Sequence, residues 1–119
     1  LEFSNKIELN IQGNEGSTAL ILACRHRHND VVNLLLDHSG TNIDMNRRDC
    51  RGSTALIVAC KNGYKDVVQL LLEHSSTNFD LNARDNAGRT AIDLATLLYG
   101  GDEIVKLLLE HGQKKSRFG

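Results

Sequence analysis

The chain has 119 residues, enough for one domain, and its 40% hydrophobic and 24% charged residues argue against disorder. With a formal net charge of −1, no overall field draws it to nucleic acid or a membrane, and no apolar run approaches the ~20 residues of a membrane span, so we expect neither partner. Three cysteines without a C-x-x-C spacing favour a reducing, intracellular location, which we take to be the cytoplasm.

The chain opens on residues that predict no helix. Residues 1–6 begin Leu-Glu-Phe without an initiator Met, and we interpret them as a cloning remnant or linker. Lys6–Asn10 stands in phase with two later segments, Asn42–Asn46 and Asn78–Asn82. The sequence therefore predicts that residues 7–12 form the connector arm of a repeat whose helices are missing.

A repeat of 36 residues organises the rest of the chain. The run GSTALI at 16–21 returns at 52–57, and a third version, GRTAID, stands at 88–93. Residues 13–48 and 49–84 are identical at 21 of 36 positions, which chance similarity does not produce. We therefore predict a repeat domain over 7–112 with an arm (7–12) and three repeats (13–48, 49–84 and 85–112), followed by a basic tail (113–119).

Each repeat first predicts a short helix, expected at 19–26, 55–62 and 91–98. A threonine precedes each one, and its hydroxyl can accept a hydrogen bond from the unpaired N–H groups of a helix start. A turn follows, in which Arg27 occupies the position of Gly63 in the second repeat. If this turn needs a left-handed residue, Arg27 costs roughly 1 kcal/mol there.

A second helix is expected to begin at an acid in each repeat, namely Asp30, Asp66 and Asp102, which suits the positive end of a helix dipole. Its apolar residues cover more than one face, so it needs neighbours on two sides, as in a stacked array. The first and third copies keep this pattern at 31–36 and 104–109, so neither has the polar outer face that is typical of a terminal repeat. We therefore expect a segment of a longer array, able to associate end to end.

The connectors between repeats alternate apolar and polar residues before a glycine-containing tip, at 42–52 and 78–88. This pattern predicts a strand-like arm that turns over at a hairpin-like tip. Together these features resemble the ankyrin repeat, whose T-x-L-x-x-A signature stands at 18–23, 54–59 and 90–95. The resemblance implies an all-α solenoid of three helix-turn-helix pairs linked by hairpin-like loops, which binds protein and is not an enzyme.

No catalytic, cofactor-binding or metal site is expected. His26 and His28 lack a third ligand at a suitable spacing. Cys24 and Cys60 stand one repeat apart, where helix packing at ~10 Å would keep them beyond the ~7 Å limit for a disulfide, and we interpret them as buried packing residues. Cys50, at a loop tip, is expected to be exposed without a histidine partner.

The resemblance implies a binding site on the concave face, made of loop tips and the exposed side of the first helices. The copies differ at these positions, as a binding face would, although drift of an unconstrained surface explains the difference equally well. Four of the residues are basic and only Glu15 is acidic, so we expect an acidic peptide or surface as partner. The expected binding residues are Asn14, Glu15, Ser17, Arg25, His26, Arg51, Ser53, Lys61, Asn62, Asn86, Arg89 and Leu97.

Two alternatives stay open. The chain could be a structural spacer or regulatory segment excised from a larger multidomain protein, an interpretation that rests on the uncapped ends. Nucleic-acid binding could use the basic column together with the tail at 114–117, but it would need a steep salt dependence and the near-neutral total charge disfavours it.

Overall fold

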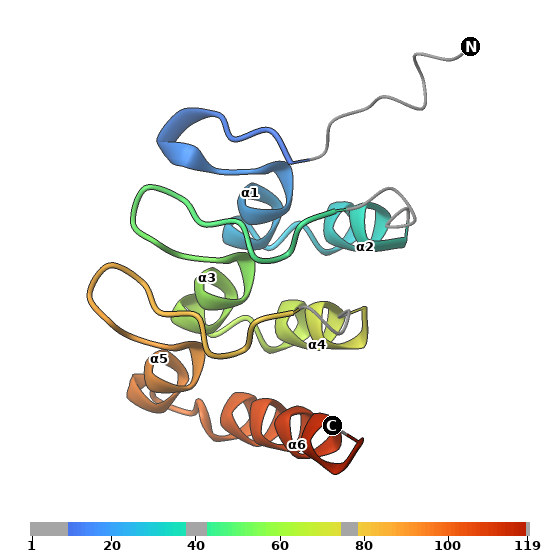
Figure 1. Cartoon of the computed structure of the whole chain (residues 1–119), viewed down its shortest axis with the longest axis vertical. Helices are drawn as coiled ribbons and strands as arrows, with labels where there is room; N and C mark the ends of the chain where they lie inside the picture. Colours follow the sequence, from blue (N-terminus) through green and yellow to red (C-terminus); the bar gives the residue numbers. More distant parts are fainter. Residues whose placement is uncertain (1–9, 38–42, 75–78, 119) are drawn as a thin grey trace.

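The computed structural model describes residues 10–37, 43–74 and 79–118, and within these ranges the helices stack in three pairs (Figure 1). Helices α1, α3 and α5 form one layer and α2, α4 and α6 the other, with loops projecting from the side of the first layer. The expected linker and most of the N-terminal arm lie outside the described residues. The α-helices are α1 (Ala19–Arg25), α2 (Asn29–Asp37), α3 (Ala55–Asn62), α4 (Lys65–Glu73), α5 (Ala91–Leu97) and α6 (Asp102–Phe118), and a 3-10 helix, η2 (Asn14–Gly16), precedes them.

Each first helix begins after a threonine, as predicted. The hydroxyls of Thr18 and Thr54 each accept a hydrogen bond of 3.2 Å from the backbone N–H three residues on. At the third helix the Asp93 carboxylate also accepts a bond from the Thr90 N–H, which completes a capping box. The predicted first helices are therefore confirmed to within a residue at either end.

The turn between α1 and α2 does require a left-handed residue. Arg27 has φ 55°, close to the 74° of Gly63 in the next repeat, so the expected backbone strain is present. The Arg27 side chain lies against the second repeat: its Nε donates to the Asp66 carboxylate at 3.3 Å, and its guanidinium lies 5.2 Å from the centre of the Tyr64 ring. Side-chain contacts thus partly offset the strain.

The prediction of strand-like arms is wrong for the described connector residues, which form turns and contain no strand. The second tip is closed by two backbone hydrogen bonds, from Asp49 N to Ser53 O and from Gly52 N to Asp49 O, and the third tip repeats both bonds 36 residues later. Adjacent tips are joined by a single further backbone bond, which does not make a ladder. At the other end, α6 continues past 112, where the third repeat was expected to end, to Phe118.

The middle repeat is the most buried part of the described structure. All six residues from Ala55 to Cys60 are buried, because α3 packs against both α1 and α5. The interpretation of Cys24 and Cys60 as buried packing residues is confirmed, and neither forms a disulfide. Burial raises the pKa of both thiols to about 12, so they stay protonated and inert.

His74 ends α4 and joins it to α2. Its Nδ1 lies 2.9 Å from the Leu70 carbonyl oxygen and its Nε2 lies 3.0 Å from Asp37 Oδ1. The bond to the Leu70 carbonyl, and then that to Asp37, raise the pKa of His74 despite partial burial. Protonated His74 therefore stabilises the folded state.

Because the folded pKa of His74 is the higher one, its contribution is complete below the unfolded pKa of about 6.5 and is lost as pH rises through the folded value. We expect the free energy of unfolding to fall by at most about 1 kcal/mol over this window. Urea unfolding at a series of pH values should show the slope, and His74→Gln should remove it. The exposed His28→Gln is the matched control, and an equal loss of slope in both variants would contradict the assignment.

Candidate interaction surface

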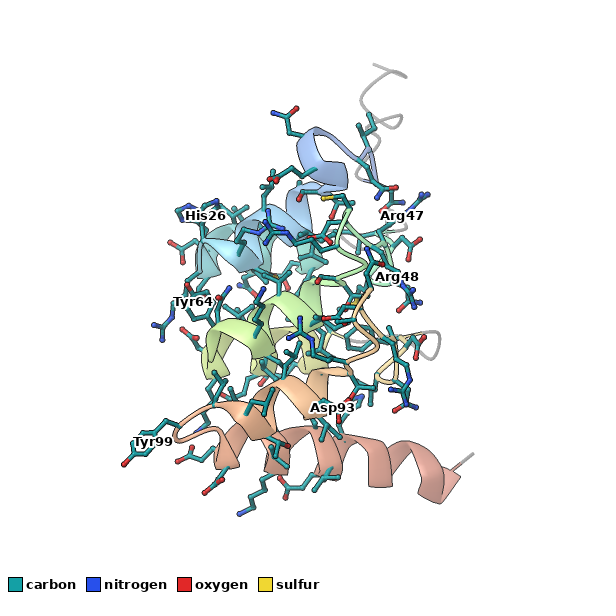
Figure 2. The ribbon with its side chains drawn as sticks, turned by 90° about the vertical axis from the view of Figure 1, so that its left-hand side faces the viewer. His26, Arg47, Arg48, Tyr64, Asp93 and Tyr99 are labelled. Carbon is teal, nitrogen blue, oxygen red and sulfur yellow. The ribbon has the colours of Figure 1, made fainter. Side chains whose placement is uncertain are left out.

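The predicted binding face is the side of the stack that carries the loops and helices α1, α3 and α5, which Figure 2 views directly. His26, Tyr64 and Tyr99 mark the ends of the first helices on one edge of this face, and Arg47 and Arg48 lie on the opposite edge among the loops. Among the described residues, a pocket lies on this side at the boundary between the first and second repeats and another at the boundary between the second and third.

The pocket at the first boundary has a volume of about 130 Å³. Arg25, on α1, crosses this boundary: its Nη2 donates to Asp49 Oδ2 at 2.8 Å and its Nη1 to Ser17 Oγ at 3.1 Å. The Asp49 side chain is only 3% exposed, so this ion pair is largely withdrawn from water. The positive charge of Arg25 is therefore compensated by Asp49 within the stack. The lining residues are Glu15, Arg25, Asp49, Cys50 and Arg51.

The pocket at the second boundary is larger, about 270 Å³, and its cations differ in their pairing. Arg89 is bound to Asp85 of its own loop, at 3.0 Å. Arg51 and Lys61 are exposed, and across 10–37, 43–74 and 79–118 neither side chain has a partner. Two uncompensated positive charges thus border one pocket. Its lining residues are Cys50, Arg51, Ser53, Lys61, Asp85, Asn86, Ala87 and Arg89.

Comparison with protein families agrees with this architecture. Residues 40–118 match the family model described as ankyrin repeats (3 copies), and residues 15–50 match that for the ankyrin repeat. The chain belongs to the ankyrin repeat family. Among curated proteins, none matches the chain significantly. Ankyrin repeats are generally protein–protein interaction modules and typically not enzymes, and the predicted all-α repeat solenoid is confirmed.

Several predicted binding residues have structural roles in this ankyrin repeat stack. Ser17 and Ser53 are buried, contrary to the expectation of an exposed surface, because they lie beneath the loops at the helix starts. Asn86 joins the second and third tips: its N–H donates to Arg51 O at 2.9 Å and its Nδ2 to Cys50 O at 3.0 Å. The remaining predicted residues that line neither pocket are Asn14, His26, Asn62 and Leu97, all exposed.

The sequence-based prediction missed Asp49 and Asp85, which organise the second and third loops. Each carboxylate accepts two backbone N–H bonds of 2.9 Å within its own tip. Burial opposes ionisation of Asp85, but hydrogen bonds from Arg89 and Ala87 outweigh it and lower the pKa of this carboxyl. Aspartate recurs at these positions one period apart, where the first repeat has Gly13, and this recurrence could have identified them.

A larger pocket, of about 390 Å³, lies on the other side of the ankyrin stack between α4 and α6. Its charged residues include Glu73 and Glu110, so it would repel the acidic partner expected for the concave face. It also lies outside the surface formed by loop tips and first helices. We therefore centre the candidate site on the second boundary.

The ring centroids of His26 and His28 lie 6.0 Å apart at the end of α1. The described residues contain no group of three or more His, Cys, Asp or Glu side chains placed to hold a metal ion. None of the helices in the described part of the chain has the length and apolar character that crossing a bilayer requires.

Proposed function

We propose that this ankyrin repeat domain binds an acidic segment of a partner protein through its concave face, with Arg51 and Lys61 as the anchoring cations. One observation supports this most directly. Both side chains are exposed beside a pocket of about 270 Å³ and lack a partner among the described residues. Arg25 and Arg89, by contrast, are already paired with buried aspartates.

A carboxylate between Arg51 and Lys61 would meet two positive charges without first breaking an internal ion pair. Such exposed cations speed and orient encounter with an acidic partner, and their effect weakens as salt screens the charges. The acid that lines this pocket, Asp85, is neutralised by Arg89, so it offers little repulsion. We therefore expect binding to weaken with increasing ionic strength.

The direct test uses a dye-labelled glutamate-rich peptide as probe and measures its Kd by fluorescence anisotropy. Reversing both charges, Arg51→Glu with Lys61→Glu, should weaken binding at least about tenfold, a loss of about 1.4 kcal/mol. The control carries Arg48→Glu with Arg47→Glu, the same change in net charge on the opposite edge of the face. An equal loss in both double variants would show a non-specific charge effect and overturn the site.

A pull-down with the wild-type chain and with the Arg51/Lys61 double variant would then identify the natural partner by mass spectrometry. A second candidate role, a structural spacer or regulatory segment of a larger protein, is supported by exposed apolar side chains on α1 and α2. That role does not need the two unpaired cations. We also infer an intracellular, cytoplasmic location, which three free cysteines support.

A further inference from the structure

None of the residues in 10–37, 43–74 and 79–118 covers the side of the first helix pair that faces away from the second, although its counterpart in the second pair is a buried interface. Val58 and Val67 are 6% and 0% exposed, because α3 and α4 pack against α1 and α2. The residues 36 positions earlier, Leu22 and Val31, are 43% and 44% exposed. Equivalent apolar positions are thus buried at the boundary between the first and second repeats and exposed at the N-terminal end of the stack.

Asn10, the first described residue, makes the contact that a connector residue makes at the following boundary. Asp44 N donates a 2.7 Å hydrogen bond to Asn10 Oδ1, and Asp80 N donates a 2.8 Å bond to Asn46 Oδ1. Both partners of the second bond stand 36 residues after those of the first. Asn10 therefore occupies the place that Asn46 takes at the following boundary.

The polar contacts between repeats are also incomplete at this end. At each described boundary a cation at the turn or at the start of the second helix reaches an acid of the next repeat: Arg27, in the turn, pairs with Asp66, and Lys65, the first residue of α4, pairs with Glu103. Asp30 is the corresponding acid of the first repeat. It is exposed, and no cation pairs with it in the described part of the chain.

The opposite end of the stack is different. Ile57 and Cys60 are buried, and their counterparts in the third repeat are Asp93 and Thr96, both exposed. Asp93 is engaged in the capping box, and the Thr96 hydroxyl donates to the Ile92 carbonyl at 2.7 Å. On α5, a second copy of this chain would therefore offer polar side chains to Leu22, in place of the apolar ones that α1 offers to Val58. The two ends of the stack thus differ in polarity. End-to-end association stays a prediction, and the polar side chains on α5 disfavour it.

We propose that the open side of α1 and α2 is an inter-repeat interface, covered by a further ankyrin-type helix pair carried ahead of Asn10 in the same polypeptide. Continuity with the connector at Asn10 identifies this occupant, because that connector leads directly out of such a pair. The occupant presents apolar side chains to Leu22 and Val31 and a lysine or arginine to Asp30. This interface is separate from the pocket at Arg51 and Lys61.

The parent gene provides the first test. Its coding sequence should contain a T-x-L-x-x-A signature about 36 residues ahead of Thr18 and a basic residue in register with Arg27 or with Lys65. An upstream sequence without this pattern would overturn the proposal.

The second test measures the interface itself. A copy of residues 49–84 replaces residues 1–12, and the effect of Leu22→Glu on the unfolding equilibrium constant is compared with its effect in the original chain. Leu22→Glu should change the unfolding equilibrium constant less than about threefold in the original chain and more than about 30-fold in the extended chain, because residue 22 is buried only in the extended chain. Light scattering on the original chain checks for a second copy as occupant. A dimer that Leu22→Glu dissociates, or equal effects in both chains, would contradict the proposal.

A matched control uses the same extension with two changes in the added copy, at the positions of Ile57 and Cys60, to aspartate and threonine. These are the residues that the third repeat carries at its outer side. This polar version should fail to protect α1, so that Leu22→Glu again has a small effect. A large effect in the control would show that added length, not an apolar interface, caused the change.

Discussion

Replacing Asp49 by alanine is expected to lower the free energy of unfolding by about 3 kcal/mol, because it removes one buried carboxylate that serves three donors. Asp49 Oδ1 accepts 2.9 Å bonds from the backbone N–H groups of Arg51 and Ser53, and Oδ2 accepts the 2.8 Å bond from Arg25. The variant would leave two backbone groups without an acceptor inside the tip and would unpair Arg25. Chemical denaturation followed by far-UV circular dichroism measures the loss.

The control for Asp49→Ala is Asp80→Ala. Asp80 is exposed and accepts a similar 2.9 Å backbone bond, from Asn82, so its removal should cost less than about 1 kcal/mol. The loss in free energy of unfolding for Asp49→Asn should lie between those of the two alanine variants, since an amide oxygen can keep the backbone bonds while its NH2 group faces Arg25. Equal losses for the two alanine variants would refute the role assigned to Asp49.

Gly52→Ala and Gly88→Ala form a pair that should differ in stability although their backbones are alike. Both glycines have positive φ, 78° and 80°, so a side chain costs about 1 kcal/mol at either position. A Cβ at Gly88 meets open space, but a Cβ at Gly52 would overlap the Asn86 side chain and lie 2.8 Å from the Asn86 backbone nitrogen. We expect a loss of more than about 2 kcal/mol for Gly52→Ala and about 1 kcal/mol for Gly88→Ala.

Denaturant titration measures this difference, and hydrogen exchange of the Asn86 amide locates it. That amide donates to Arg51 O at 2.9 Å and should exchange faster in Gly52→Ala, while Gly88→Ala should leave it protected. Similar losses in both variants would mean that the contact between the second and third tips contributes little to stability.

The helices were predictable because their signals are local and repeated. The threonine before each first helix, the acid at the start of each second helix and the period of 36 together located all six helices. The left-handed turn at Arg27 was likewise indicated by its alignment with Gly63. Errors arose in the connectors, where alternation predicted strands but adjacent tips share only a single backbone hydrogen bond.

The candidate site was predictable only in outline. Arg25, Arg51 and Arg89 look alike in the sequence, yet Arg25 is paired across a repeat boundary, Arg89 within its loop, and Arg51 with no described residue. These differences depend on where two buried aspartates lie in space, which residue type alone does not show. Burial of Ser17 likewise follows from the folding of the loop over the helix start.

The uncovered first pair also makes the stack uneven along its length. Helices α1 and α2 rest on one described neighbouring pair and contain the strained Arg27 turn, whereas α3 and α4 are held from both sides. Fraying should therefore begin at α1 and α2, as a local opening that leaves the centre closed. Such an opening exposes Cys24 but not Cys60. A thiol reagent should therefore label Cys24 at a rate set by this local opening and Cys60 at a rate set by opening of the centre of the stack.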